Sequence, residues 1–452
     1  MESIQQIAEK FIRNVVGVDL CEGLTEGLEK LKEASSQFIC QVVEQKLVEL
    51  DTVLFENPRY RPNWIVEHRA VPREVLTTFG MIQFNRRYYR HRKSGEHRYL
   101  VDNLVGIVPG ERVEAGLVAD LCEAATDNSY AKSARICCDS GLSRQTVMRK
   151  TRLVKDLKAA EVEQRKAVRV IHLQADEDHV AMQDGRRDTL VKLVAIHEPA
   201  LKVSKKRWML PQRHLMSSYG EAVEDFWLRV ADEIDRRYGD RNDLTIYVHG
   251  DGANWIRSGT KWLKNSHFVL DKFHVRQMVK RVAGNNEAYA QYIWDCFEMN
   301  ERAKINELTQ AFIDSEVCAE TSGQEFIKYI RSNWDGIQIW YDERHQAGRS
   351  CAEGLVSHVL SSRLSSRPCG WRDEGLETVS RLRVHMLNGG RITPDNVRKT
   401  PKVAIRAIKA LQKAVTLDAR YEWNGGRILH TDHRSSPEYR LFKAITRGGR
   451  TI

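Results

Sequence analysis

The sequence predicts an α/β protein in which a mixed β-sheet core follows a mainly helical N-terminal region and is interrupted by an all-helical segment. Three observations predict this class. Residues 168–274 alternate between short β-branched runs and amphipathic helical stretches, as strands joined by helical crossovers do. Residues 275–345 keep helical spacing throughout. Residues 1–50 and 113–155 are also helical in pattern, with a ribbon-like segment between them.

The N-terminal region begins with a long helical pattern and continues into a β-ribbon. Leu24, Leu28 and Leu31 recur close to a helical period, so residues 1–50 are expected to be helical. Residues 55–72 contain three prolines and are expected to form a loop. Residues 74–92 alternate apolar and polar side chains on both sides of Gly80, which predicts two strands. The basic run at 86–93 either contacts phosphates or is a solvated surface.

Residues 129–154 have the length and layout of a helix-turn-helix. Ala131, Ala134 and Ile136 are expected on one face of the first helix. Gly141 would supply the turn and Ser143 the N-cap of the second helix. The second helix would then present its early residues to a DNA groove, and the candidates for contact are Arg144, Gln145, Thr146, Arg149 and Lys150. A plain helical hairpin is the alternative.

The next segment predicts the order of elements in the core. Strands are expected at 168–176, at 189–198 and within 205–218, followed by a helix at 220–239, a strand at 244–252, a short helix, and a strand at 266–274 that runs into a helix. The first three strands can form a meander, and the last two can join it through helical crossovers. After the helical segment 275–345, residues 350–371 are expected to form a helix that stops near Pro368.

Charge and composition restrict the class of protein and its partners. The chain has 71 Lys and Arg against 61 Asp and Glu, a net charge of +10, and residues 391–452 carry 14 basic and 5 acidic residues. Basic patches attract polyanions, chiefly nucleic acid, although a solvated surface is the alternative. No stretch approaches the ~18 apolar residues of a membrane span, and the N-terminus lacks a signal-peptide pattern, so a cytoplasmic protein is expected. The nine cysteines include no C-x-x-C pair, which supports neither a disulfide framework nor a structural zinc site.

Three carboxylates stand where predicted elements end or begin. Asp176 ends the first core strand, Asp251 ends the fourth, and Glu353 lies early in the helix after the all-helical segment. Carboxylates that converge in such a crevice suit Mg²⁺ or Mn²⁺, and two such ions support phosphodiester chemistry. Each also has an ordinary interpretation. ADED at 175–178 offers three acids, Asp-Gly at 251–252 is a common turn pair, and Glu353 can stabilise a helix dipole.

Four segments together resemble the motifs of a bacterial insertion-sequence transposase family, long catalogued as an uncharacterised protein family and related to the Mutator-like DDE transposases. They are LQADEDHVAMQ, YVHGDGANWI, LDKFHV and CAEGLVSHVLSSRLSSRPCGW. The resemblance covers most of the chain, from the basic ribbon to about Gly390. It implies a ribonuclease-H-like catalytic core with a helical insertion before the final glutamate. It also implies that Asp176, Asp251 and Glu353 are the catalytic residues and hold two Mg²⁺ ions, with Mn²⁺ as a substitute.

The resemblance also implies roles around the site. Asp271 and His274 match an acidic-or-Cys-x-x-His element of Mutator-like enzymes and would support the site without ligating metal; a hydrogen-bonded core histidine is the alternative for His274. Arg363, Arg367 and Trp371 fall in the last matched segment and would hold DNA near the scissile phosphate. Trp371 would stack on a displaced base, or it packs in the core.

We therefore expect a DDE transposase that binds terminal inverted repeats, nicks DNA at element ends and joins the freed 3′-hydroxyl to target DNA. It would act as a homodimer or larger assembly in the bacterial cytoplasm, associated with the nucleoid when bound to DNA. The alternatives are a structure-selective metal-dependent DNA nuclease on the same core and a non-catalytic DNA-binding regulator. The expected domains are 1–55 (helical), 56–112 (basic β-ribbon), 113–160 (helix-turn-helix), 161–274 (first part of the core), 275–345 (helical insertion), 346–390 (final catalytic helix) and 391–452 (basic tail).

Overall fold

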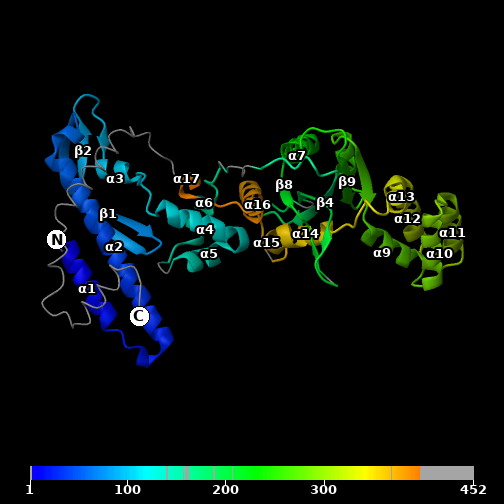
Figure 1. Cartoon of the computed structure of the whole chain (residues 1–452), viewed down its shortest axis with the longest axis horizontal. Coiled ribbons are helices and arrows are strands. Elements are labelled where there is room, and N and C mark those ends of the chain that lie inside the picture. Colours follow the sequence, from blue (N-terminus) through cyan, green and yellow to red (C-terminus); the bar gives the residue numbers. More distant parts are fainter. Residues whose placement is uncertain are drawn as a thin grey trace. The chain divides into compact units, whose positions relative to one another are not determined.

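The computed structural model describes residues 3–138, 141–155, 157, 162–186, 189–205, 207–367 and 369–397. The described residues fall into two compact units: the first comprises those within 3–125, 129–155 and 392–397, and the second those within 126–128 and 157–391. Figure 1 shows the elements in chain order. Within the described part of the chain, no helix combines the length and apolar character needed to cross a membrane. Of the basic tail, 398–452 lies outside the described residues.

The first unit opens with two helices, as predicted. Helix α1 (Ile4–Val16) begins at a capping box in which Ser3 and Gln6 bond reciprocally, and α2 (Leu24–Glu56) follows after a short 3₁₀ turn. The rings of Phe11 and Phe38 stack between the helices with their centroids 4.6 Å apart. The C-terminal half of α2 packs on a ribbon of antiparallel strands, β1 (Trp64–Thr77), β2 (Gly80–His91) and β3 (His97–Arg98).

The prediction of a loop at residues 55–72 is wrong. Helix α2 reaches Glu56, a 3₁₀ turn spans Pro58–Tyr60, and β1 already begins at Trp64. Strand β1 is an edge strand, and its register shifts between His68 and Val71, just before Pro72. Proline is tolerated on an edge strand beside a bulge because no ladder hydrogen bond is lost there.

Four further helices follow the ribbon along the chain, and a fifth helix, α17, comes from the C-terminal segment that belongs to the first unit. They are α3 (Leu100–Val105), α4 (Ala115–Asp127), α5 (Tyr130–Cys137), α6 (Arg144–Thr151) and α17 (Pro394–Val397). Helix α4 ends at the division between the units.

The second unit is built around a five-stranded mixed sheet with the order β10-β9-β4-β5-β8. The strands are β4 (Val170–Val180), β5 (Thr189–His197), β8 (His214–Ser218), β9 (Thr245–Gly250) and β10 (Ser266–Leu270). Strands β4, β5 and β8 form an antiparallel meander, whereas β9 and β10 run parallel to β4. Helix α7 (Val223–Tyr238) and the short α8 (Asn254–Ser258) make the crossovers. This is the predicted order of elements.

The two faces of β4 carry different chemistry. Ile171, Leu173 and Ala175 are fully buried in the core that contains Phe226 and Trp227 of α7. Successive side chains of a strand alternate between faces, so His172, Gln174, Asp176 and Asp178 share the opposite face. That face is covered by the helices that follow the insertion, because α14 (Ala352–Val356) packs on β4.

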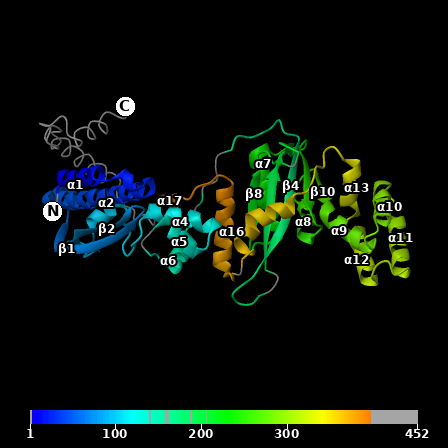
Figure 2. The same cartoon turned by 90° about the horizontal axis from the view of Figure 1, so that it is seen from below.

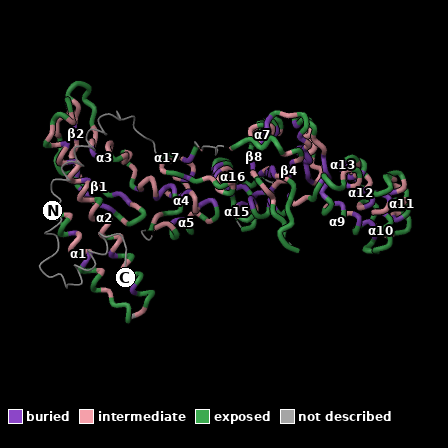
Figure 3. The backbone as a smooth tube through the Cα atoms, in the orientation of Figure 1, coloured by how far each residue is buried: buried purple, intermediate pink, exposed green. Residues whose placement is uncertain are grey.

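The helical insertion consists of five helices that follow β10. They are α9 (Lys272–Val282), α10 (Glu287–Glu298), α11 (Arg302–Asp314), α12 (Glu320–Ser332) and α13 (Trp334–Asp342). In Figures 1 and 2 they gather beyond the β9–β10 side of the sheet. Helix α13 packs on β10, and the indole N–H of Trp340 donates to the carbonyl of Leu270 over 2.8 Å. The insertion therefore shares a core with the sheet, and Figure 3 shows its outer surface exposed.

After the insertion, α14 continues through a π-helical turn (Ser357–Ser361) into α15 (Ser362–Leu364), and α16 (Asp373–Leu387) follows. The helix expected at 350–371 thus ends at Leu364, and Pro368 lies outside the described residues.

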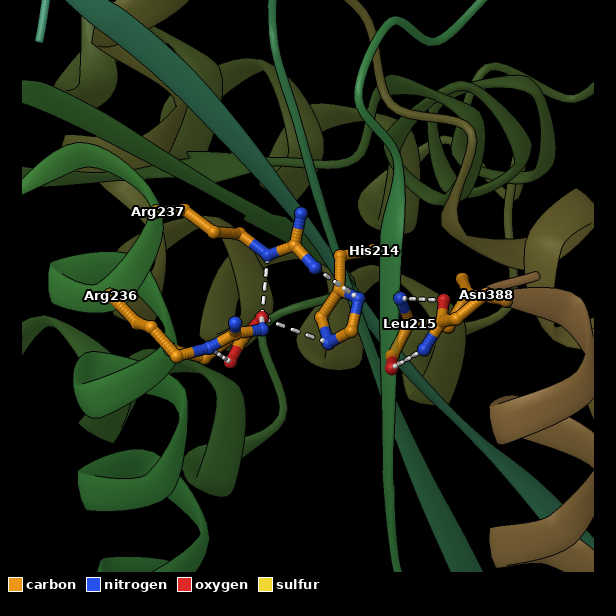
Figure 4. A network of polar contacts seen from close by, with 6 residues as sticks. His214, Leu215, Arg236, Arg237 and Asn388 are labelled. Carbon is orange, nitrogen blue, oxygen red and sulfur yellow. Dashed lines mark hydrogen bonds and ion pairs between the residues drawn. The ribbon is translucent and has the colours of Figure 1, made fainter. Parts of the chain in front are cut away.

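Strand β8 is an edge strand, and Figure 4 shows its contacts with Asn388 and with residues of α7. The side-chain amide of Asn388 accepts from the Leu215 N–H over 2.8 Å and donates to the Leu215 carbonyl over 2.9 Å, as a neighbouring strand would. From α7, Glu233 contacts His214, Arg236 and Arg237. Burial, and then the charge of Arg237, lowers the pKa of His214 to about 4, so the imidazole is neutral at neutral pH.

Candidate active site

Three aspartates reach the same edge of the sheet on three neighbouring strands. The parallel pairing of β4 with β9 runs from Val170↔Thr245 to Gln174↔His249, and Asp176 and Asp251 each lie two residues further on. Asp271 follows β10 directly, and its N–H donates to the carbonyl of Gly250 over 2.8 Å. Carboxyl ends of parallel strands are common ligand positions because the loops diverge there.

The prediction that Asp176 ends its strand is wrong. Strand β4 continues to Val180, because β5 pairs with it as far as Val180↔Thr189. Strand β9, in contrast, stops at Gly250. Asp176 therefore lies on β4 just beyond the point where the parallel strand β9 ends. Strands β4 and β9 are no longer paired there.

The structure distinguishes the three acids of ADED. The Glu177 carboxylate accepts from the indole N–H of Trp255 over 2.5 Å. The buried Asp178 accepts from the hydroxyls of Ser361 and Ser365, both over 2.8 Å. Asp176 accepts from the backbone N–H of Glu177 over 2.9 Å, and no side chain of the described residues donates to it. Of the three, Asp176 is thus the carboxylate left available to a ligand.

The electrostatics of Asp176 are those of a carboxylate held among like charges. Burial raises the pKa of Asp176 to about 6, and the charges of Asp251 and Glu177 raise it as well, whereas the Glu177 N–H and His274 oppose the shift. A half-buried carboxylate whose pKa is raised by burial and by neighbouring carboxylates is typical of catalytic and cation-binding sites.

Asp251 is fixed by contacts on both sides of its turn. Its carboxylate accepts from the Ala253 N–H over 2.9 Å, and its carbonyl accepts from the Tyr329 hydroxyl over 2.6 Å. Gly252 has φ +98°, and a Cβ there would lie 2.6 Å from Oδ1 of Asn333. The Asp-Gly pair is a turn, as the ordinary interpretation had it, and this turn is also where insertion helix α12 meets the sheet.

Asp271 and His274 flank the same edge. The buried Asp271 is the N-cap of α9 and accepts from the Phe273 N–H over 2.9 Å. His274 lies in the first turn of that helix, half-buried, close enough to Asp176 to act on its pKa. The structure therefore brings both residues beside the aspartate pair.

Glu353 lies on the helix that covers the Asp176 face of β4, and its side chain is exposed. Gln174 fastens the start of this helix, since it donates to the Arg349 carbonyl over 3.3 Å and accepts from the Cys351 N–H over 3.0 Å. Asp178 fastens the far end through Ser361 and Ser365. Asp176 stands between these two attachments.

The three predicted ligands are not assembled into a closed site. Among the described residues, no three Asp, Glu, His or Cys side chains, Glu353 and the two aspartates included, converge closely enough to hold an ion. The donor chemistry nevertheless suits Mg²⁺, because Asp176 and Asp251 offer carboxylate oxygens at a partly open edge.

The helix-turn-helix candidates lie on α5 and α6. Gly141 has φ +65°, and Ser143 caps α6 by accepting from the Thr146 N–H. Arg144, Gln145 and Arg149 are exposed, Thr146 is half-buried, and Lys150 forms an ion pair with Glu111.

The prediction that Ala131, Ala134 and Ile136 share one face of the first helix of this pair is wrong. Ala131 and Ile136 are exposed, while Ser133 and Ala134 are buried. Helix α5 is two turns long, so its inward stripe is narrow.

Trp371 packs in the core, as the alternative interpretation proposed. Its side chain is 6% exposed, and its indole N–H donates to the Leu364 carbonyl over 2.9 Å. The Arg363 guanidinium lies 4.8 Å from the Trp371 ring centroid, and Arg367 is exposed. A base cannot stack on Trp371 unless this packing opens.

Sequence reasoning missed three residues of the site. Gln174 is a polar residue within an apolar strand, a signal that was available in the sequence. Trp255 and Tyr329 follow ordinary helical patterns, and only the tertiary structure places them beside Glu177 and Asp251.

The chain matches a family and several curated proteins. A model described as "Uncharacterised protein family (UPF0236)" matches residues 20–400. A UPF0236 protein of Caldanaerobacter subterraneus subsp. tengcongensis, whose name joins eleven locus labels, is 32% identical over 459 residues, covering 98% of this chain and 97% of its own length. A second from the same organism, with four labels, is 33% identical over 457 residues, with 98% and 97% covered. The chain therefore belongs to the uncharacterised protein family UPF0236.

Proposed function

We propose that this protein is a DDE-type DNA transposase on a ribonuclease-H-like core. The observation that carries the proposal is the alignment of Asp176 and Asp251 at one sheet edge, with the Glu353 helix fastened over the same strand by Gln174 and Asp178. Such an edge suits metal-dependent phosphodiester chemistry.

Two further observations support it. The sheet has three antiparallel strands followed by two parallel ones, with the first strand in the centre, and five helices precede the Glu353 helix; this is the arrangement that a ribonuclease-H-like core with an insertion calls for. The names of the relatives join several locus labels of one organism, as expected when an element multiplies within a genome.

Asp176, Asp251 and Glu353 would hold two Mg²⁺ ions, which when bound activate an attacking oxygen and stabilise the leaving one. The chain itself holds the two aspartates at fixed register, and Tyr329, Asp271 and His274 support that edge. In the first displacement a water oxygen bonds to phosphorus and the P–O3′ bond breaks. In the second, the freed 3′-oxygen bonds to a target phosphorus and the target P–O3′ bond breaks.

The test is Mg²⁺-dependent nicking of a DNA fragment that carries the end of the element flanking this gene. Wild type is compared with Asp251→Asn, and with Asp314→Asn on the exposed side of α11 as a matched control. We expect the wild type and the control to nick at the element end and Asp251→Asn to bind DNA without nicking.

Other outcomes select the alternatives. Cleavage of branched DNA with no strand-transfer product would identify a nuclease on the same core. Binding without cleavage by wild type, in Mg²⁺ and in Mn²⁺, would refute the catalytic proposal and favour a regulator.

A further inference from the structure

A cluster of basic residues adjoins the aspartate edge. Lys272 follows Asp271 directly, and the carbonyl of Arg349 accepts from the side-chain amide of Gln174. Burial lowers the pKa of Lys272, and the charges of Arg344, Arg349 and Arg276 lower it further. Arg344 pairs with Glu298, but no carboxylate of the described residues pairs with Lys272, Arg276 or Arg349. Cations that lie together without acidic partners favour an anionic ligand.

The cluster leads to an exposed tryptophan. A small hairpin, β6 (Leu201–Lys202) and β7 (Trp208–Met209), is inserted between β5 and β8. Trp208 is 48% exposed, and the Arg349 guanidinium lies 5.8 Å from its ring centroid. Trp208, Arg207 and Arg213 line one surface hollow with Met209 and neighbouring apolar residues.

Arg213 lines this hollow and is also close enough to Cys351 for its charge to act on that thiol. The charges of both Asp271 and Arg213 act on the Cys351 thiol, whose pKa burial raises to about 11. Cys351 is itself hydrogen-bonded to Gln174, two residues before Asp176. The hairpin, the cations and the aspartate edge therefore belong to one neighbourhood of the second unit.

The chemistry of this surface fits an unpaired nucleotide. Guanidinium and ammonium groups bind phosphates, and an exposed indole stacks on a base face. In a duplex both faces of a base are covered by its neighbours, so a side chain stacks on a base that is unpaired or extruded. Arg349 beside the ring adds a cation close to the stacking platform.

We propose that Trp208, with Arg213 and Arg349, binds an unpaired nucleotide of the DNA strand that lies at the aspartate edge. This inference rests on the proposed function, because it assigns the substrate strand to the same site.

The test measures binding of the full chain in EDTA, where no cleavage contributes. The probes are a fluorescent duplex with a single-stranded 3′ tail and the same duplex without the tail. We expect Trp208→Ala to weaken binding of the tailed duplex between about fivefold and 150-fold, the factor that one base–aromatic stack supplies, and to leave the blunt duplex unchanged. Trp208→Phe keeps a stacking ring and restores most of the affinity.

Two charge variants provide an independent readout. Arg213→Ala and Arg349→Ala should each lower the slope of log affinity against log salt for the tail by about 0.7. Arg302→Ala, an exposed arginine at the start of α11, is the matched control and should leave the slope unchanged. Thermal unfolding establishes that each variant is folded.

Three results would overturn the inference. They are equal affinity of wild type and Trp208→Ala for the tail, equal losses on both probes, or a change in assembly mass with tail binding unchanged, which would assign the hairpin to a second copy of the chain. Failure of nicking would refute the proposed function but not these binding differences, so the two failures are distinguishable.

Discussion

Asp176→Asn should stabilise the metal-free protein at neutral and alkaline pH. Burial and the neighbouring carboxylates raise the pKa of Asp176 from 3.8 to about 6, so folding favours the protonated acid. Its contribution to stability is complete below pH 3.8 and is lost as the pH rises through about 6. The difference corresponds to about 3 kcal/mol, which solvent screening at this partly exposed group reduces to about 1–2 kcal/mol.

The assay is thermal unfolding in EDTA, at about pH 5, below the raised pKa of Asp176, and at about pH 8, above it. At the higher pH we expect the Asn variant to unfold about 2–8 °C above wild type, given about 2–4 °C per kcal/mol for a domain of this size. The advantage should shrink as the pH falls. Asp342→Asn, exposed at the end of α13, is the matched control and should show no such dependence.

The second measurement is the stabilisation of wild type and of the Asn variant by added Mg²⁺. At ten times its dissociation constant the ion should stabilise wild type by about 1.4 kcal/mol and the Asn variant by much less. A variant no more stable than wild type at high pH, or equal stabilisation of both proteins by Mg²⁺, would refute the assignment of Asp176 as a metal ligand with a raised pKa.

Three other substitutions test contacts around the site. Tyr329→Phe removes the hydroxyl that donates to the Asp251 carbonyl; we expect the Mg²⁺ concentration for half-maximal nicking to rise severalfold, with about 1 kcal/mol of stability lost. Gly252→Ala places a Cβ at φ +98° and 2.6 Å from Asn333, so unfolding should become easier by about 1–3 kcal/mol. Arg383→Met removes the guanidinium that donates to the buried carbonyls of Thr126 and Val359 and to the part-buried carbonyl of His358, and it should cost about 2–4 kcal/mol, measured as a lower Tm.

Matched controls separate these effects from general damage. Tyr292→Phe, on an exposed face of α10, should leave the metal dependence unchanged. Gly354→Ala, where a Cβ would meet nothing within 4 Å, should not lower stability. Arg381→Met, at a half-buried arginine of α16 that pairs with Glu377, should cost far less than Arg383→Met. If a control matches its partner variant, the contact named for that variant is not the cause.

The element order of the core could be predicted because its signals are local. Strands β4, β5 and β9 are β-branched runs, and α7 combines an apolar stripe with a glycine at its end. The loop predicted at 55–72 failed because proline is a strong local signal, whereas an edge strand with a register shift accommodates it. Ile136 was misplaced because a two-turn helix has too few residues to define an inward face.

The candidate site was predictable in part. Asp251 and Glu353 lie where the sequence placed them, after a strand and in the first turn of a helix. The choice of Asp176 over Glu177 and Asp178 depended on Trp255, Ser361 and Ser365, which lie far along the chain. No local pattern reports which distant donor a carboxylate will meet.

The sequence by itself determined the types and order of the elements and the positions of the acidic residues along them, because hydrophobic period and turn chemistry act over a few residues. The tertiary structure alone decided that β9 stops beside Asp176, that Tyr329 of the insertion reaches Asp251, and that Trp371 is buried while Trp208 is exposed. These outcomes depend on which segments meet across gaps of many residues. They are settled by the packing of the whole unit, since each burial or hydrogen bond requires a partner that the local sequence does not contain.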